Sequence, residues 1–520
     1  MIRTPLAAVA ATLLSAGLFA LAYPPFGIRP LAFVCLAPFF LAIGGGGASR
    51  AVGLAWLWAV VASCGIASVF PGSIASYYMR SLWFGWAVGI LLFTAMASFY
   101  YMAFAPVYRV LVRRPGLATP FLVAAAWVSV ELARGRLFTG TPFFIGNPWG
   151  LLGYTHASGA LAQVASWTGV YGIGFAIVAV NAGLTGWIEA LRDPARSARA
   201  AARALALATA PALAIGLGGA WTLHRAPGPS EGEGFVEMAV VQGNVSLGRR
   251  WRSDYYGRNL DVYLGLTRQA LAQGRPRTVV WPESSMTFFL EREPLYARAI
   301  ARVLAVGDAE LLAGGPSGDG TPPAYNSVFR ISPDGSIGAR YDKQYLVPFS
   351  EYFPLAGLDL VRRRMEGART FAHGAPEGGV LDTRMGRVGM LICNEGMLPE
   401  VAGDRVRAGA ELLVSPSNDN WIAGEGFAEH YLAVVALRSI EQRRYLVRAS
   451  TAGPSAVVDP WGRILVRTPS RSSHLLLGRV RPETELSVYG RVGDAFALAC
   501  VALTAGGLLH ALARTRRATG

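Results

Sequence analysis

Long apolar runs alternate with short arginine-bearing segments over the first 223 residues. A helix needs roughly 20 apolar residues to cross a bilayer, and seven of these runs approach or exceed that length. An eighth run lies near the C-terminus. We therefore predict about eight transmembrane helices, at residues 5–22, 31–48, 51–70, 82–106, 118–134, 168–191, 201–222 and 492–513.

The pattern changes after a Pro- and Gly-rich segment from His224 to Gly234, which we interpret as a linker. Short β-rich runs then alternate with helical ones, which predicts an α/β layered domain. The expected strands are 236–242, 278–281, 311–313, 327–331, 388–392, 412–415, 445–449 and 456–458, and the expected helices are 254–273, 293–306, 397–408 and 426–443. A hairpin turn at 332–336 predicts a mixed sheet.

These patterns divide the chain into residues 1–223 (seven transmembrane helices), 224–234 (linker), 235–489 (α/β domain) and 490–520 (last transmembrane helix and tail). The amino-acid composition also indicates a membrane part, because 52% of the 520 residues are hydrophobic. The formal net charge of +15 comes from scattered arginines without a dense basic block, so we expect no nucleic-acid partner.

The arginine distribution predicts the orientation. With the N-terminus cytoplasmic, the inside segments hold the longer list: Arg3, Arg50, Arg109, Arg113, Arg114, Arg192, Arg196, Arg199, Arg514, Arg516 and Arg517, against Arg29, Arg80, Arg134, Arg136 and Arg225 outside. The first run could instead be a cleaved signal peptide, although Pro24, Pro25 and the later spans favour an uncleaved helix. In either case the α/β domain is expected outside.

Cys393 is the cysteine of the soluble part, and it follows the apolar run from Val388 to Ile392. A thiol in this place is commonly a buried structural group. The polar Asn394 and Glu395 after it indicate instead that the strand emerges into a turn and a helix. A helix N-terminus and nearby cations would favour the thiolate, so Cys393 is a candidate nucleophile.

Lys343 is the single lysine among 48 basic residues. Arginine cannot replace lysine where a compact donor is needed, so we interpret Lys343 as functional. Glu283 ends the run from Thr278, and a carboxylate there can act as a general base for the thiol. Glu351 lies close behind the lysine, where a surface charge is an equally good interpretation.

Other catalytic patterns are missing from the sequence. His373, His430 and His474 belong to no motif, and no HExxH, P-loop or GxSxG occurs. The soluble part has no CxxC pair for zinc. We expect neither a metal nor a cofactor.

The order Glu, Lys, Cys at the ends of β-runs resembles the nitrilase superfamily. Together with the apolar spans, the chain resembles the bacterial apolipoprotein N-acyltransferase family. The matching motifs are Tyr23–Gly27, Gly146–Gly150, Val241–Asn244, Trp281–Glu283, Tyr325–Ser327, Leu346–Glu351 and Ser417–Trp421. The resemblance implies a multi-pass helical membrane domain joined to an α-β-β-α sandwich on the periplasmic side of the inner membrane.

The resemblance also implies residue roles. Glu283 is the general base, Lys343 stabilises the oxyanion and Cys393 carries the acyl group. Glu351, Glu395 and Asn394 are supporting residues, and the backbone N–H of Asn394 could join the oxyanion site. The positions expected to contact substrate are Trp251, Tyr352, Asn326 and Trp421.

The implied reaction is a ping-pong acyl transfer. A phospholipid donates an acyl chain to Cys393 as a thioester, and the α-amino group of a diacylglyceryl-cysteine on an apolipoprotein accepts it. We expect a monomer in the lipid bilayer. A membrane-tethered amidase of the same superfamily is the alternative enzyme, and a transporter with an accessory domain is the non-enzyme alternative.

Two positions depart from the family pattern. Asn394 stands where tyrosine is common, and the run Ser450–Gly453 lacks the usual asparagine before glycine. Both departures concern local contacts near the expected site, and neither removes Glu283, Lys343 or Cys393.

Overall fold

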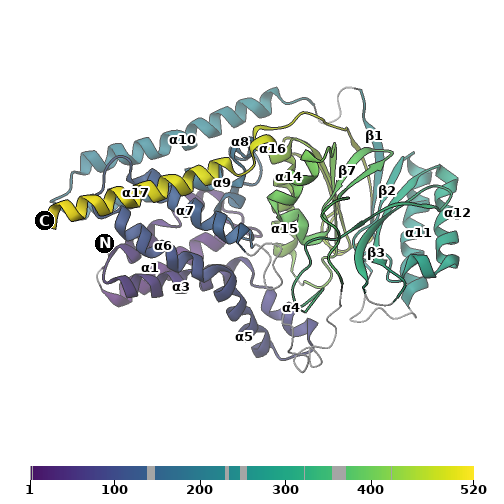
Figure 1. The fold of residues 1–520 in the computed structure, drawn as a ribbon, viewed down its shortest axis with the longest axis horizontal. Coiled ribbons are helices and arrows are strands. Elements are labelled where there is room, and N and C mark those ends of the chain that lie inside the picture. Colours follow the sequence, from purple (N-terminus) through teal and green to yellow (C-terminus); the bar gives the residue numbers. More distant parts are fainter. Residues whose placement is uncertain are drawn as a thin grey trace.

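The structure is a computed structural model that describes residues 2, 4–137, 147–228, 233–245, 255–320, 323–353, 371–422 and 424–519. A bundle of long helices holds both chain ends, and a domain of two sheets covered by helices lies beside it (Figure 1). The fold therefore has a helical part and an α/β part.

The helical bundle is built from the N-terminal helices and the last helix. Its elements are α1 (Pro5–Leu21), α2 (Ala37–Gly44), α3 (Ala48–Ile66), α4 (Phe70–Tyr77), α5 (Leu82–Phe93), α6 (Phe99–Leu111), α7 (Thr119–Arg136), α8 (Ala165–Thr168), α9 (Val170–Arg192), α10 (Ala198–Arg225) and α17 (Ala495–Thr519). Within the described ranges, five helical segments are long and apolar enough to cross a membrane: Ala48–Ile66, Leu82–Leu111, Val170–Arg192, Ala198–Arg225 and Ala495–Ala513. The count of eight spans stays a prediction.

The stretch at 31–48 is not the continuous helix that we expected. The structure divides it into a 3-10 turn at Arg29–Phe33 and the short helix α2, which ends at Gly44. Pro30 and Pro38 each lie in the first turn of their own element. Proline lacks a backbone N–H and fits a first turn, so the second proline starts a new helix where it would break a continuing one.

Two six-stranded sheets form the α/β domain. Their strands run in the orders β12-β1-β2-β3-β4-β5 and β11-β10-β9-β8-β7-β6. Parallel pairs occur at β1/β2, β2/β3, β7/β8 and β8/β9, so the predicted mixed sheet is confirmed. The strands are β1 (Val236–Gln242), β2 (Thr278–Val280), β3 (Glu310–Ser317), β4 (Tyr325–Ile331), β5 (Ile337–Asp342), β6 (Val380–Thr383), β7 (Gly386–Met390), β8 (Leu412–Ser417), β9 (Tyr445–Ser450), β10 (Ala456–Val458), β11 (Ile464–Arg467) and β12 (His474–Val480).

Alternation along the strands builds an α-β-β-α sandwich. In β2 and β3, Val280 and Leu312 belong to the core between the two sheets, whereas Val279 and Leu311 belong to the core under the outer helices. Helices α11 (Tyr256–Gln273) and α12 (Pro294–Gly307) contribute to that outer core. Helices α14 (Pro399–Arg407) and α15 (Glu425–Gln442) cover the second sheet in the same way.

Helix α15 is buried on two sides. Leu432 and Val435 pack in the core against the second sheet, and Val434, Leu437 and Ile440 pack in the core of the helical bundle. A helix with apolar side chains on two faces can pack against a different core on each of them. Helix α15 therefore joins the catalytic domain to the bundle (Figure 1).

We expect Leu437→Ala to lower the free energy of unfolding by about 2–5 kcal/mol, because it removes a fully buried side chain from the joint. Thermal unfolding in detergent, followed by tryptophan fluorescence, measures the change. Leu477→Ala is the matched control, since Leu477 is 38% exposed on β12 and its loss should cost less than about 0.5 kcal/mol. Equal effects of the two substitutions would contradict the role assigned to α15.

Candidate active site

The predicted catalytic residues come together where strands end. Glu283 follows β2, Lys343 directly follows β5, and Cys393 follows β7. The Lys343 ammonium lies 3.5 Å from Glu283 Oε1, and the charges of both residues act on the Cys393 thiol. The three side chains that the sequence analysis selected thus share one site.

Gly314 makes this close approach possible. It lies in β3 beside the turn that carries Glu283, and a Cβ atom there would be 2.4 Å from the carbonyl oxygen of Pro282 and 2.6 Å from Cα of Glu283. No side chain fits at those distances, so glycine lets the Glu283 turn lie directly against β3.

Lys343 is held by two carboxylates. Its side chain has no exposed surface, and Nζ lies 2.7 Å from Glu351 Oε2 as well as near Glu283. Burial lowers the pKa of Lys343, but Glu351, Glu283 and Cys393 together raise it above its ordinary value. The residue is therefore a fixed ammonium and a donor aimed at the site.

Asn326 links the two carboxylates. Its Nδ2 donates to Glu283 Oε1 at 2.8 Å and to Glu351 Oε1 at 2.6 Å. The backbone N–H of Asn418 donates to Glu283 Oε2 at 2.9 Å, and that of Val347 donates to Glu351 Oε2 at 2.8 Å. Each carboxylate is oriented from both of its oxygens, which fixes its position beside the lysine.

Cys393 has an unusual backbone. Its φ is +50°, in the left-handed region that non-glycine residues rarely adopt. The hydroxyl of Tyr431 on α15 donates to its carbonyl oxygen. A five-residue 3-10 turn, Cys393–Met397, begins at the thiol, and α14 starts only after it. This sharp turn leaves part of the Cys393 surface accessible.

We expected a helix N-terminus and nearby cations to favour the thiolate of Cys393, but its surroundings favour the neutral thiol. Burial raises the pKa of the thiol, Glu283 raises it further, and Lys343 lowers it without outweighing the other two. The turn after Cys393 is a short 3-10 helix, so the α-helical field that we expected at the thiol is missing there. The Cys393 thiol therefore needs a base before it can act as a nucleophile, and Glu283 is the carboxylate beside it.

Glu395 is an organising residue of the site. It has no exposed surface, and burial raises the pKa of its carboxyl. Its two oxygens accept hydrogen bonds from both sides of the site: from Tyr341 Oη, Gln344 N and Tyr345 N near the lysine, and from Ile392 N near the cysteine. Glu395 therefore joins the segment that carries Lys343 to the turn that carries Cys393.

The remaining predicted residues lie in different surroundings. Asn394 is buried, and its Nδ2 donates to Tyr345 O at 2.9 Å. Tyr352 packs its ring edge-on against His373 at 5.3 Å, and Trp421 packs against Phe70 of α4 at 6.2 Å. Trp251 lies outside the described residues.

Several residues of the site were not predicted from the sequence. Asn418 lies in the Ser417–Trp421 motif, but it acts through its backbone N–H, and Tyr431 acts through a hydroxyl on a distant element, so no local pattern marks either role. Arg405 of α14 reaches Tyr341 Oη at 2.7 Å and Met390 O at 3.2 Å. Its burial inside a helix is a signal that sequence alone does not reveal. Within the described residues, no group of His, Cys, Asp and Glu could hold a metal ion.

We expect Glu283→Gln to move thiol reactivity and catalysis in opposite directions. The substitution removes the negative charge that disfavours the thiolate, so the pKa of Cys393 should fall, and iodoacetamide labelling at pH 8 should rise. Reaction of the thiol with an acyl ester should be lost, because the carboxylate that can take its proton is gone.

Mass spectrometry of the labelled peptide gives the rate, and Cys393→Ala gives the background from the other cysteines. Slower labelling of the Gln variant than of the unchanged protein would contradict the charge arrangement.

Comparisons with known proteins identify the family. Residues 15–183 match the apolipoprotein N-acyltransferase N-terminal domain, and residues 238–486 match the carbon-nitrogen hydrolase family. An apolipoprotein N-acyltransferase of Geobacter metallireducens is 34% identical over 94% of this chain and 92% of its own length. One of Azotobacter vinelandii is 31% identical over 92% of this chain and 90% of its own.

Among solved structures, a nitrilase-superfamily amidase from Nesterenkonia is 17% identical, with a TM-score of 0.40 over 52% of this chain and 99% of its own. The two family matches and the relatives that cover nearly the whole chain agree with one another. The chain belongs to the apolipoprotein N-acyltransferase family.

Proposed function

We propose that this protein transfers an acyl chain from a phospholipid, through a thioester on Cys393, to the α-amino group of the diacylglyceryl-cysteine of an apolipoprotein. The observation that carries the proposal is the buried Lys343 ammonium, held 2.7 Å from Glu351 and 3.5 Å from Glu283 beside a neutral thiol. A base, a cationic donor and a nucleophile are the groups that acyl transfer needs.

The first half-reaction forms the thioester. Glu283 takes the proton of Cys393 while Sγ attacks the carbonyl carbon of the phospholipid ester. The Lys343 ammonium and the backbone N–H of Asn394 stabilise the oxyanion that forms. The carbon–oxygen bond then breaks, Glu283 returns the proton to the departing oxygen, and lysophospholipid leaves.

The second half-reaction makes the amide. The lipoprotein amine attacks the thioester carbonyl, Glu283 takes a proton from the nitrogen, and the carbon–sulfur bond breaks. The proton then returns to the sulfur. Glu351 and Glu395 are positioning residues in this scheme: Glu351 holds Lys343, and Glu395 holds the turn of Cys393. The substrate path in this scheme is lined by four residues: Trp251, Tyr352, Asn326 and Trp421. The amide of Asn326 also donates hydrogen bonds to Glu283 and Glu351.

We further propose that the protein is a monomer in the bacterial inner membrane with about eight spans, and that residues 235–489 lie on the periplasmic side. The domain division at 223, 234 and 489 belongs to the same proposal. The arginine distribution supports the orientation. A transporter is disfavoured, since the two acidic residues of the bundle are engaged: Glu131 accepts from Leu152 N at 2.7 Å and Glu189 pairs with Arg196 at 2.6 Å.

A phospholipid with a labelled acyl chain tests the nucleophile. The unchanged protein should carry a hydroxylamine-sensitive acyl adduct on Cys393, and Cys393→Ala should carry none. Mass spectrometry of the tryptic peptides locates the label. Cys64→Ala is the matched control, because it removes a free thiol of the helical bundle and should leave the adduct unchanged. A labelled adduct on the Cys393→Ala protein would refute the assignment.

Lys343→Arg tests why this chain keeps its single lysine. A guanidinium is larger than the ammonium, and the site gives the side chain no exposed surface, so we expect the rate of adduct formation to fall about 100-fold or more. Stopped-time labelling measures that rate. Activity close to that of the unchanged protein would show that any buried cation serves.

A further inference from the structure

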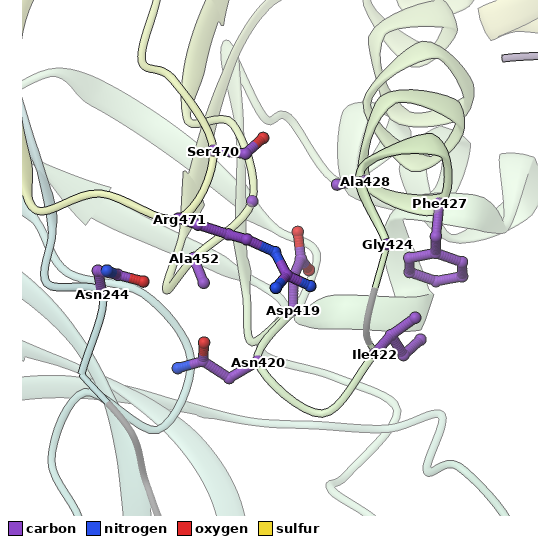
Figure 2. Close-up of a pocket in the computed structure, with 11 residues that line it drawn as sticks. Asn244, Asp419, Asn420, Ile422, Gly424, Phe427, Ala428, Ala452, Ser470 and Arg471 are labelled. Carbon is purple, nitrogen blue, oxygen red and sulfur yellow. The ribbon is translucent and has the colours of Figure 1, made fainter. Parts of the chain in front are cut away.

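A cavity lies beside the catalytic residues. Its volume is about 270 Å³, and the backbone of the loop that holds Glu283 forms part of its wall. Figure 2 shows the side chains that line it; those that carry the inference are Asn244, Asp419, Asn420, Ile422, Phe427 and Arg471. Asn418 donates its N–H to Glu283, so the adjoining Asp419 places this cavity next to the reaction centre.

The cavity carries one uncompensated positive charge. Among the described residues that line it, Asp419 is the acid and Arg471 is the base. Asp419 is already occupied, because its Oδ2 accepts from buried Arg448 at 2.5 Å and from Ser450 at 3.0 Å. In the described part of the chain no ion pair holds Arg471, whose side chain extends across the cavity in Figure 2. A free guanidinium is a binding group for a phosphate or carboxylate.

Arg471 is presented by an anchored loop. It lies between β11 and β12, where buried Gln242 donates to Pro469 O at 2.8 Å and to Ser472 O at 2.9 Å. The N–H of Arg471 donates to Ala452 O at 2.6 Å, and its φ is +56°. The loop backbone is therefore held on both sides of the arginine, as expected of a preorganised binding group.

The walls of the cavity indicate an amphiphilic ligand. One wall is polar, with Asn244 and Asn420, and the other is apolar, with Ile422 and Phe427. Phe427 stacks on Trp149 at 4.8 Å and packs against Phe70 of α4 at 5.6 Å, so the apolar wall continues into the helical bundle. A cavity of this size holds a headgroup rather than a folded peptide segment.

We propose that Arg471 binds the phosphodiester of the donor phospholipid and thereby selects phospholipid over neutral acyl esters. The inference rests on the proposed function, because it assigns the headgroup subsite of that reaction. With the phosphate at Arg471, the apolar wall at Ile422 and Phe427 leads the acyl chains toward the bundle. Arg471 is then a specificity-determining residue that takes no part in proton transfer.

The test compares two donors with the same acyl chain in detergent: phosphatidylethanolamine and the neutral p-nitrophenyl ester. Loss of a charge-assisted hydrogen bond should raise the KM of Arg471→Gln for phosphatidylethanolamine about tenfold or more. Adduct formation on Cys393 from the neutral ester should not change. For phosphatidylethanolamine, the KM of Arg471→Lys should lie between those of the unchanged protein and of Arg471→Gln. Lysine keeps the positive charge but lacks the paired N–H donors of the guanidinium.

Arg467→Gln is the matched control, because Arg467 lies at the end of β11 and pairs with Glu429 away from the cavity lining. Three results would overturn the inference: an unchanged KM in Arg471→Gln, an equal loss with both donors, or a loss confined to transfer onto the lipoprotein amine. The last would assign the cavity to the acceptor. Failure of the proposed function is distinguishable, since the unchanged protein would then form no Cys393 adduct from phosphatidylethanolamine.

Discussion

The buried charge of Lys343 is the constraint on which the site depends. An ammonium without exposed surface is costly unless carboxylates compensate it at short distance. Glu351 and Glu283 do so, and each must itself be held, by Val347 N and Asn418 N. One buried cation thus requires the strand ends of both sheets to meet, and it makes the position of each carboxylate depend on the other.

Asn326 shows how strict this dependence is. A single amide nitrogen donates to both carboxylates, so neither can turn without losing a hydrogen bond inside a closed space. The lysine also lies directly after β5, whose register with β4 places Asp342 opposite Ser327. The β4–β5 hairpin therefore fixes the backbone position from which Lys343 extends, and the carboxylates fix the direction of its side chain.

Helix α15 extends this constraint to the bundle. Tyr431 on one turn of α15 donates to the carbonyl oxygen of the nucleophile, and Leu437 further along packs among residues of the membrane part. His430 lies edge-on to Trp149 and Tyr23, with ring centroids 4.2 and 5.1 Å away. The backbone of Cys393 is consequently positioned by a helix that also packs against the bundle. Helix α15 thus connects the bundle to Cys393.

Much of the α/β domain was predictable, because its helices and buried strands follow simple periodicities. The helices expected at 254–273, 293–306, 397–408 and 426–443 are found as α11, α12, α14 and α15. The strands β5, β6, β11 and β12 were missed. Each lies at the edge of a sheet, where one long side lacks a strand partner and the side chains are partly exposed, so the apolar signal is weak.

The candidate site was predictable only as far as single residues mark it. A unique lysine, a cysteine after an apolar strand and a Trp-Pro-Glu strand end are local features. The hydrogen bonds that orient Glu283 are not local in the sequence. Asn326 is 43 residues from Glu283, and Asn418 is 135 residues from it. Such pairs follow from strand order and sheet packing, which no window of sequence contains.

The protonation state of Cys393 connects the chemistry to the environment. The sequence pattern led us to expect surroundings that favour a thiolate, but burial and the neighbouring Glu283 raise the pKa of the thiol. A neutral thiol is chemically silent until a base acts, so the proton leaves only when an acyl group is in place for sulfur to attack. The raised pKa of the thiol and its need for a base are therefore two effects of one cause, the burial of Cys393 beside Glu283.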